Sequence, residues 1–409
     1  MVIREFHQHG DNQLTVSQNY YSPVSHGQNK ATVRDTIFLD FQATTPLDPV
    51  VLEAMLPWMN GAYNAHATEH RIGQMAYDAV EEAREKVATL LGCQHSEITF
   101  TSGATEASNI ILRGVTIPGD KITLSAIEHA SVMETGKSLT SQGRGMRLVG
   151  VTDDGILDLD ELESILSERP TLVSIMAVNN EIGTIQAIEE VAGLCADYGA
   201  MLHSDLTQAV GRISVSLSNS TVDYASISSH KIYGPQGIGA LFTKNGSRKP
   251  NPLFTGGGQE DGVRSGTLPV ASCVGFGVAC ELAATQRKKD FDHAKSLSLL
   301  MLDSLAGLDG WQINGSLEER IPHNLSIAFE RVDAQALLAA IPELALSTGS
   351  ACSSGSMKGS DTLRSIGLSD ELTGGTIRIG FGRTTTPDEV RMAADLLCNR
   401  VSSLRKSIV

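Results

Sequence analysis

The chain has 409 residues, 41% of them hydrophobic and 19% charged, which is enough for two or more packed domains. Its net charge of −15 argues against a nucleic-acid partner, which would require a basic face, and no apolar run approaches the roughly 18–20 residues that cross a membrane. The six cysteines are scattered without a CxxC pair, which indicates reduced thiols in the cytoplasm rather than a disulfide or zinc framework.

The N-terminal segment differs from the rest of the chain. Residues 1–35 are polar and contain His7, His9 and His26. They lack the apolar core of a secretion signal and the Arg-rich amphipathic pattern of a transit peptide. We expect a flexible, solvated extension, although its histidines also suit adventitious metal binding.

Helices and short apolar strands alternate from Thr36 onward. A first helix begins at Asp48-Pro49, a cap followed by a first-turn proline. Apolar residues at helical spacing predict a helix over 72–91, with Gly92 as its C-cap. Strands are expected over residues 97–101, 121–125, 171–178, 201–204, 224–228 and 240–243. This alternation predicts an α/β domain with a mostly parallel sheet.

The pattern changes after about Ala283. A long polar helix over 281–305 is expected to connect to a smaller α+β part, whose last helix opens at Thr386-Pro387. The expected organisation is an N-terminal extension (1–35), a large cofactor-binding domain (51–285) and a small domain (36–50 and 286–409).

Lys231 is a candidate catalytic residue. It follows a β-rich run over 222–227 and is preceded by Ser228 and His230, with a glycine-rich turn after it. A lysine at a strand end can form a Schiff base, and neighbouring hydroxyl and imidazole groups can hold a phosphate. Pyridoxal phosphate (PLP) enzymes need this arrangement. The alternative is a surface lysine before a Gly/Pro turn.

A carboxylate and an amide follow another predicted strand end, where open α/β sheets bind ligands. Asp205 is suited to keep the pyridine nitrogen of PLP protonated, and Gln208 to hydrogen-bond the ring hydroxyl oxygen. The alternative for Asp205 is a helix N-cap.

Two further strand ends carry polar groups. Residues 101–106, including Ala104 and Thr105, form a hydroxyl-rich turn into a helix, where backbone N–H groups and the helix dipole suit a phosphate. His129 is suited to stack on a pyridine ring and to shuttle protons. An ordinary capped helix and a structural histidine are the simpler alternatives.

The last candidates concern a substrate. Cys352 lies in the middle of a small-residue loop, which suits a mobile thiol that accepts a sulfur atom, unless it is an ordinary loop cysteine. Arg378 or Arg383 is suited to clamp an amino-acid carboxylate, and Asn180 to reach the same substrate; a structural role is the alternative.

His66 and His70 have the spacing that metals use on a helix face. With Asn64 and two alanines around them, we instead expect a substrate-entry loop and no metal site.

Together these residues resemble the cysteine desulfurase family, PLP enzymes with the class V aminotransferase fold, and within it the iron–sulfur cluster assembly branch. The similarity runs from Phe38 to about Leu396. Its landmarks are residues 39–46, 101–106, 178–183, 228–239, 256–258, 264–269 and 350–352. The resemblance implies a type I PLP fold, with a large, mostly parallel domain and a smaller α+β C-terminal domain that carries the cysteine loop.

The resemblance also implies a role for each matching residue. Lys231 would hold PLP as the internal aldimine, Asp205 would pair with the pyridine nitrogen, Gln208 would contact the ring hydroxyl, and His129 would stack on the ring and relay protons. The residues implied at the phosphate are Ala104, Thr105, Ser228 and His230, with Thr267 contributed by the partner subunit of a homodimer. Those implied at the substrate carboxylate are Arg378 and Asn180, with Asn64 as a weaker candidate; Asn180 also counts among the cofactor-binding residues.

Cys352 would attack the sulfur of PLP-bound L-cysteine, keep it as a persulfide and leave L-alanine. An iron–sulfur scaffold protein or a tRNA-thiolating enzyme would then accept the sulfur. Two alternatives remain open: a selenocysteine lyase or another class V PLP enzyme, and a non-catalytic binding subunit with this fold.

Overall fold

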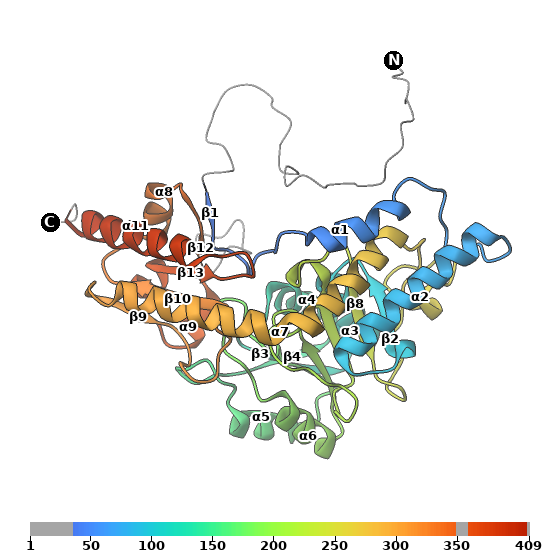
Figure 1. Cartoon of the computed structure of the whole chain (residues 1–409). Coiled ribbons are helices and arrows are strands. Elements are labelled where there is room, and N and C mark those ends of the chain that lie inside the picture. The colour runs from blue at the N-terminus through green and yellow to red at the C-terminus, as the bar shows by residue number, and fades with distance from the viewer. Residues whose placement is uncertain (1–35, 349–358, 407–409) are drawn as a thin grey trace, which may run out of the picture. The chain divides into compact units, whose positions relative to one another are not determined.

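A seven-stranded mixed sheet lies at the centre of the larger part of the fold, in a computed structural model that describes residues 36–348 and 359–406 (Figure 1). The strand order is β2-β8-β7-β6-β5-β3-β4. β8 runs antiparallel to both of its neighbours, and the remaining pairs are parallel. The strands are β2 (Ile98–Thr101), β3 (Lys121–Ser125), β4 (Gly145–Val149), β5 (Leu172–Ser174), β6 (Met201–Asp205), β7 (Tyr224–Ser228) and β8 (Gly239–Thr243). The predicted mostly parallel α/β sheet is confirmed.

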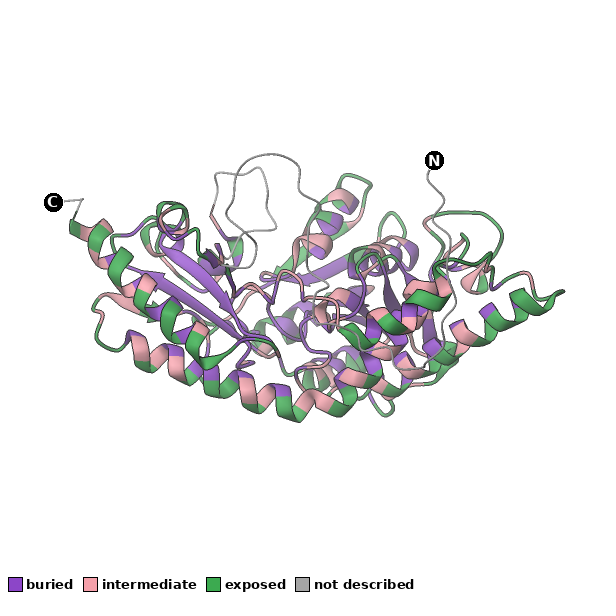
Figure 2. Ribbon diagram, turned by 45° about the horizontal axis from the view of Figure 1, so that its top comes forward, coloured by how far each residue is buried: buried purple, intermediate pink, exposed green. Residues whose placement is uncertain are grey.

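Helices cover both faces of this sheet, because successive strand residues point to opposite sides. In β7, Tyr224 joins the apolar cluster that includes α3 and α4, whereas Ala225 and Ile227 join the cluster on the other face. The helices around the sheet are α1 (Pro49–Met55), α2 (Arg71–Leu91), α3 (Ala104–Gly114), α4 (Ala130–Thr140), α5 (Leu159–Leu166) and α6 (Ile188–Tyr198). Short 3-10 turns within the described residues are η2 (Leu56–Trp58), η3 (His95–Glu97), η4 (Ser229–Lys231) and η5 (Glu260–Gly262). Figure 2 shows buried strands between helices whose outer faces are exposed.

A second apolar cluster lies around a smaller antiparallel sheet of order β12-β13-β10-β9. Its strands are β9 (Trp311–Ile313), β10 (Asn324–Phe329), β12 (Ser347–Thr348) and β13 (Thr376–Gly380). β1 (Ile37–Phe38) pairs in parallel with β11 (Leu344–Ala345), so the first described residues join the C-terminal part. The helices of this part are α8 (Ala334–Ala340), α9 (Asp361–Ser365), α10 (Asp370–Gly374) and α11 (Pro387–Lys406). These cores support the division at residues 50 and 285, which stays a prediction; the extension over 1–35 lies outside the described residues.

Helix α7 (Val270–Leu305) contributes to both clusters and begins before the expected start at residue 281. The early turns contain Gly275 and Gly277, which reduce the sequence signal for a helix. Both are packing positions. A Cβ atom on Gly277 would lie 2.7 Å from the Cα of Ala83 in α2, and one on Gly275 would lie 2.6 Å from the Sδ of Met55. The glycines therefore let neighbouring chain segments approach α7 closely.

The strand expected over 171–178 is shorter than predicted, because β5 ends at Ser174. The N–H of Met176 donates to the Glu128 Oε1 atom at 2.6 Å instead of to a neighbouring strand. Gly92 caps α2 in the left-handed conformation, as predicted. No helix within the described residues has the length and apolar character that a membrane crossing requires.

Arg383 lies where the two parts of the fold meet: its ion pairs are within the expected small domain, and its contact with Tyr233 reaches the larger part. Its guanidinium lies 2.8 Å from both Asp48 and Asp290, and it stacks over the ring of Tyr233 at 4.2 Å from the centroid. These groups are mostly buried, so loss of the cation would leave two carboxylates without their partner.

We expect Arg383→Met to lower the free energy of unfolding by about 3 kcal/mol, because it strands two poorly hydrated carboxylates. Urea denaturation followed by circular dichroism measures this change. The matched control is Arg391→Met, which removes an exposed ion pair to Asp388 and should cost less than about 1 kcal/mol. Equal losses for the two variants would contradict the structural role of Arg383.

Candidate active site

A cavity of about 240 Å³ lies where strands β6 and β7 end. The residues predicted from the sequence that line it are Ala104, Thr105, His129, Asn180, Asp205, Gln208, Ser228, His230, Lys231 and Arg378. The sequence predicted no individual role for six further lining residues: Gln42, Ala43, Ser131, Met176, Val178 and Thr207. The carboxyl ends of neighbouring parallel strands meet at one edge of a sheet, which explains why residues far apart in sequence converge here.

Lys231 ends the short turn η4 directly after β7. Its Nζ donates to the backbone carbonyls of Gln42 at 2.6 Å and Ala43 at 2.7 Å. Both acceptors are neutral carbonyl oxygens, and these two contacts orient the amine. Gln42 and Ala43 therefore form part of the lysine's surroundings, although most strands of the large sheet lie between them and β7 in the sequence.

Asp205 is the last residue of β6 and is 4% exposed. Its Oδ1 accepts the N–H of Thr207 at 2.9 Å, which caps a turn rather than a helix. Thr207 lines the same cavity, and its hydroxyl oxygen is buried without a hydrogen-bond partner within the described residues. The cavity wall at the end of β6 therefore contains the Asp205 carboxylate and, close to it in sequence, Thr207.

The N-terminus of α3 forms the opposite end of the cavity, which continues into an adjoining space of about 330 Å³. The N–H of Ala104 donates to the Ser228 Oγ at 3.0 Å, and the Nδ1 of His230 lies 3.0 Å from the Thr44 Oγ1. Burial and the nearby charges of Lys231 and Arg212 lower the pKa of His230 to about 4. His230 is therefore neutral at pH 7, and this end presents hydroxyl, imidazole and helix-dipole groups suited to an anion.

His129 is the N-cap of α4. Its Nδ1 accepts the N–H of Ser131 at 3.1 Å and lies 2.8 Å from the hydroxyl of that residue. A ring nitrogen that accepts a backbone N–H has a lone pair, so the proton of the neutral ring lies on Nε2. The capping contact thereby fixes which nitrogen can donate.

Arg378 places a guanidinium at the cavity from β13 and is 1% exposed. Its Nη2 lies 2.8 Å from the Asp40 Oδ1, its Nη1 donates to the Asn180 carbonyl at 3.0 Å, and its Nε has no partner. Of the two arginines that the sequence offered for a carboxylate clamp, Arg378 lines the cavity and Arg383 lies at the junction described above. Arg378 is therefore the candidate for an anionic substrate group.

Two predicted residues within the described part of the chain, Thr267 and Asn64, do not line the cavity. Thr267 lies outside it, in agreement with its expected role in a partner subunit, and that role stays a prediction. Asn64 instead accepts the N–H of His66 at 3.0 Å in the turn before α2. Cys352 lies outside the described residues.

His70 is the N-cap of α2, so His66 and His70 do not share a helix face. Among residues 36–348 and 359–406, no cluster of three or more potential metal-binding side chains was found.

The donor set fits PLP. Lys231 supplies the amine for its aldehyde, Asp205 an anion for its ring nitrogen, and the α3 terminus with Ser228 and His230 a cradle for its phosphate. Thr207 also lines the cavity, and its buried hydroxyl has no hydrogen-bond partner within the described residues, which agrees with a further polar group at this wall. Gln42 and Ala43 contribute through their backbone; only the resemblance over residues 39–46 pointed to this segment.

Glu181 is a half-buried acid near Arg378 and His129, which line the cavity. Its Oε2 accepts the hydroxyl of Ser360 at 2.5 Å. Burial raises its pKa to about 7, although Ser360, Arg378 and His129 act in the opposite direction. The folded chain therefore holds this proton more tightly than the unfolded chain does.

The class-V aminotransferase family model matches residues 37–392 of the chain. A protein of Rickettsia felis named cysteine desulfurase IscS is 42% identical and is aligned over 90% of this chain and 92% of its own length. Its namesake from Rickettsia massiliae is 40% identical, with 92% and 93% of the two chains covered.

Solved structures of similar proteins have the same fold. A NifS-like protein superposes with a TM-score of 0.84 at 35% identity and covers 90% of this chain and 100% of its own. The X-ray structure of a NifS-like protein from Rickettsia africae gives a TM-score of 0.82 at 31% identity, with 90% and 99% covered. The structure of SspA in complex with cysteine gives 0.76 at 29% identity, with 86% and 100% covered.

Glu181→Gln should change how stability depends on pH. Because the pKa of Glu181 is about 7 in the folded chain against an ordinary value of 4.5, its contribution to stability is complete below pH 4.5 and is lost as pH rises toward 7. The variant lacks this loss. The difference in unfolding free energy between the variant and wild type should therefore shift by roughly 3 kcal/mol in favour of the variant between pH 4.5 and pH 8. Urea denaturation at several pH values tests this, and parallel pH profiles for the two proteins would contradict it.

Proposed function

Because the chain belongs to the class-V aminotransferase family, we propose that it is a cysteine desulfurase that converts L-cysteine to L-alanine and holds the sulfur as a persulfide on Cys352. It is a PLP-dependent enzyme. The observation that carries the proposal is the convergence of Lys231, Asp205 and Arg378 on one cavity. An amine, an anion and a guanidinium are the groups needed to bind PLP and an amino acid together.

Lys231 would carry the cofactor, with Asp205 at the ring nitrogen and Gln208 at the ring oxygen. Ala104, Thr105, Ser228 and His230 would hold the phosphate at the α3 terminus. When bound, PLP supplies the electron sink for negative charge that develops on the substrate. Asp205 supports that function because its carboxylate favours a protonated ring nitrogen.

Arg378 would bind the carboxylate of the substrate. Its Nε is unpartnered, and its contact with Asp40 fixes the plane of the guanidinium. Asn180 lines the same wall and accepts from Arg378 through its carbonyl, which leaves its side chain for the substrate or the ring. His129 would stack on the cofactor ring and relay a proton through Nε2.

The residues that flank the cysteine segment support a role for Cys352. Ser347 donates to the Asp40 Oδ1 at 3.0 Å, and Ser360 donates to Glu181. Both flanking contacts therefore lead to groups beside Arg378. We infer that the thiolate of Cys352 attacks the substrate sulfur, so that an S–S bond forms and the C–S bond breaks, with its electron pair left on the substrate carbon.

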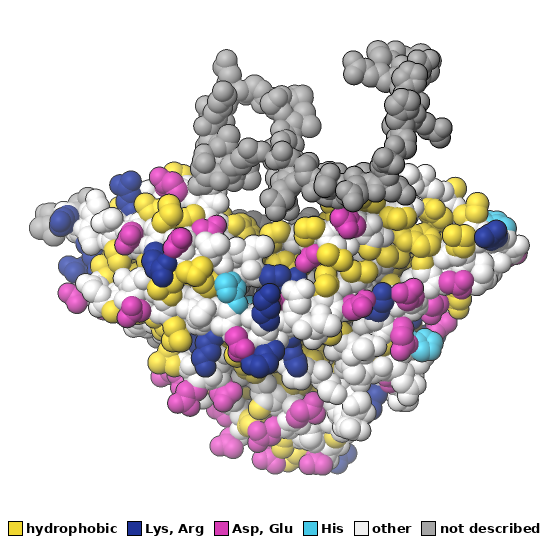
Figure 3. All heavy atoms as spheres, viewed as in Figure 1, with side chains coloured by type: hydrophobic (Ala, Val, Ile, Leu, Met, Phe, Trp, Pro, Cys, Tyr) yellow, Lys and Arg dark blue, Asp and Glu magenta, His cyan; other side chains and the backbone are white. Residues whose placement is uncertain are grey.

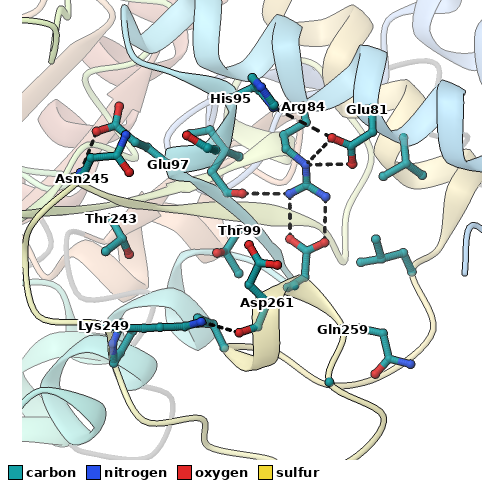
Figure 4. Close-up of a pocket in the computed structure, with 18 of the residues that line it drawn as sticks. Glu81, Arg84, His95, Glu97, Thr99, Thr243, Asn245, Lys249, Gln259 and Asp261 are labelled. Atoms are coloured by element: carbon teal, nitrogen blue, oxygen red, sulfur yellow. Dashed lines mark hydrogen bonds and ion pairs between the residues drawn. The ribbon is translucent and has the colours of Figure 1, made fainter.

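We also propose an obligate homodimer in which Thr267 completes the phosphate site of the partner. The segment before Thr267 is fixed to its own chain: the two Nη atoms of Arg84 each lie 2.8 Å from the Glu260 carboxylate, beside a cavity of about 610 Å³ (Figure 4). The N–H of Gly266 donates to the Gln259 Oε1 at 2.9 Å. A segment held in this way can present a side chain outward.

An exposed apolar surface around the first two helices supports the same proposal. Figure 3 shows hydrophobic side chains gathered over α1 and the start of α2. Its large exposed members are Val50, Leu56, Met59, Ile72, Met75 and Tyr77. Contiguous apolar surface of this kind marks protein interfaces.

We propose that the sulfur passes to an iron–sulfur scaffold protein or a tRNA-thiolating enzyme in the cytoplasm. The resemblance to the iron–sulfur assembly branch supports the class of acceptor. A cytoplasmic location is supported by the described cysteines, all of which are free thiols: Cys93, Cys195, Cys273, Cys280 and Cys398.

Alanine release from L-cysteine, with a reductant present, is the direct test. Lys231→Ala and Cys352→Ala should each lower the rate by at least ~10³-fold, because one removes the cofactor attachment and the other the sulfur acceptor. Lys137→Ala and Cys93→Ala, which lie outside the cavity, should keep the wild-type rate. A PLP-loaded wild type that makes no alanine would refute the substrate assignment. Selenocysteine turnover that survives Cys352→Ala, without cysteine turnover in wild type, would favour a selenocysteine lyase.

Subunit mixing tests the shared site. Co-expression of Lys231→Ala with Thr267→Asp should restore roughly a quarter of wild-type activity, because half of the dimers are mixed and each contains one complete site. Each variant expressed alone should be inactive. No recovery in purified mixed dimers would contradict a Thr267 that acts across the interface.

A further inference from the structure

Arg212 is a buried cation behind the cavity, and no function described so far uses it. It is 6% exposed, and no ion pair among the described residues includes it. Burial lowers the pKa of Arg212 to about 10; Tyr233 raises this pKa and Arg378 lowers it further. Arg212 therefore stays charged at neutral pH. Burial of a charge costs desolvation free energy, which must be offset by hydrogen bonds or by an opposite charge.

All of its hydrogen bonds go to neutral oxygens. Arg212 donates to the carbonyl and to the Oε1 of Gln208, and to the carbonyl of Phe41 at 3.3 Å. Gln208 in turn lines the cavity and donates through Nε2 to the carbonyl of Gln42 at 3.1 Å. Arg212 therefore touches the cavity only through Gln208 and the segment that also binds Lys231.

These two neighbours fix the orientation of the Gln208 amide. A guanidinium has only donors, so the atom facing Arg212 must be the oxygen. A backbone carbonyl only accepts, so the atom facing Gln42 must be the nitrogen. The amide cannot flip without breaking both contacts. Its NH₂ group is thus presented as a donor, with one hydrogen on Gln42 and the second left for the cavity.

We propose that Arg212 is a positioning residue for the cofactor: it locks the Gln208 amide as a hydrogen-bond donor to the ring oxygen of PLP and places a positive charge behind that amide. This inference rests on the proposed assignment of Gln208 and Lys231 to the cofactor. Negative charge on the ring oxygen is stabilised, and a proton on the linkage between Lys231 and the cofactor is disfavoured. Arg212 thereby sets the pH at which the bound cofactor changes protonation.

Other charged and titratable groups face the same site from each neighbouring element. At the cavity they are Asp205 at the end of β6, His129 on α4, His230 beside Lys231, and Arg378 on β13. Beside Arg212 they are Tyr233, Asp290, His323 and Arg383. None of them contacts the Gln208 amide through a hydrogen bond, so a change that depends on Gln208 identifies Arg212 as its source.

The test is the pH midpoint of the visible absorption of the PLP-loaded holoenzyme. Arg212→Met should raise this midpoint by about one pH unit, and Arg212→Lys, which keeps the charge but loses the fork, by less. Gln208→Met should raise it too. In the double variant Arg212→Met/Gln208→Met the shift should be smaller than the sum of the single shifts, because part of the effect passes through the amide.

Arg320→Met is the matched control. Arg320 is a half-buried arginine whose pKa is also lowered to about 10 and which also donates to carbonyls, but none of the residues that accept its hydrogen bonds lines the cavity. It should lose stability without a change in the midpoint. An unchanged midpoint in Arg212→Met, or fully additive shifts in the double variant, would overturn the proposal. A wild type that binds PLP but releases no alanine would refute only the proposed reaction, since the absorption comparison does not require turnover.

Discussion

The structure depends on the contact between the amine of Lys231 and the carbonyls of Gln42 and Ala43. This contact ties the end of β7 to the segment that follows β1, the strand that pairs with β11 in the C-terminal part of the fold. The same segment accepts from Gln208 and Arg212, so three donor residues converge on the successive carbonyls of residues 41–43. The orientation of the lysine and the position of the smaller part are therefore coupled, which places Arg378 on the same cavity as Lys231.

Much of the fold and most of the candidate site could be predicted because their signals are local. The strands over 121–125 and 224–228 have the predicted bounds, since β-branched and apolar runs end at turn residues there. Asp205 and Lys231 follow strands in the sequence, and the carboxyl ends of parallel strands share one edge of a sheet. Two local observations therefore sufficed to place both residues at one cavity.

The features that could not be predicted depend on neighbours distant in sequence. Gly275 and Gly277 weaken the helix signal, and their value as packing positions appears only when α7 meets other segments. The acceptors for Lys231 are backbone carbonyls, which every residue has, so the residue type does not predict this contact. Arg212 looks like a surface cation in the sequence, and only its contact with Gln208 connects it to the cavity. Tertiary contacts, rather than propensities, decide these cases.

The most direct test of the central assignment is to locate the cofactor on the chain. The PLP-loaded enzyme would be reduced with borohydride, which makes the lysine linkage permanent, and then digested and analysed by mass spectrometry. The account predicts one pyridoxyl-labelled peptide, modified at Lys231, and no label in Lys231→Ala. A label on another lysine, or a fully loaded protein with no label at Lys231, would contradict the assignment of the site.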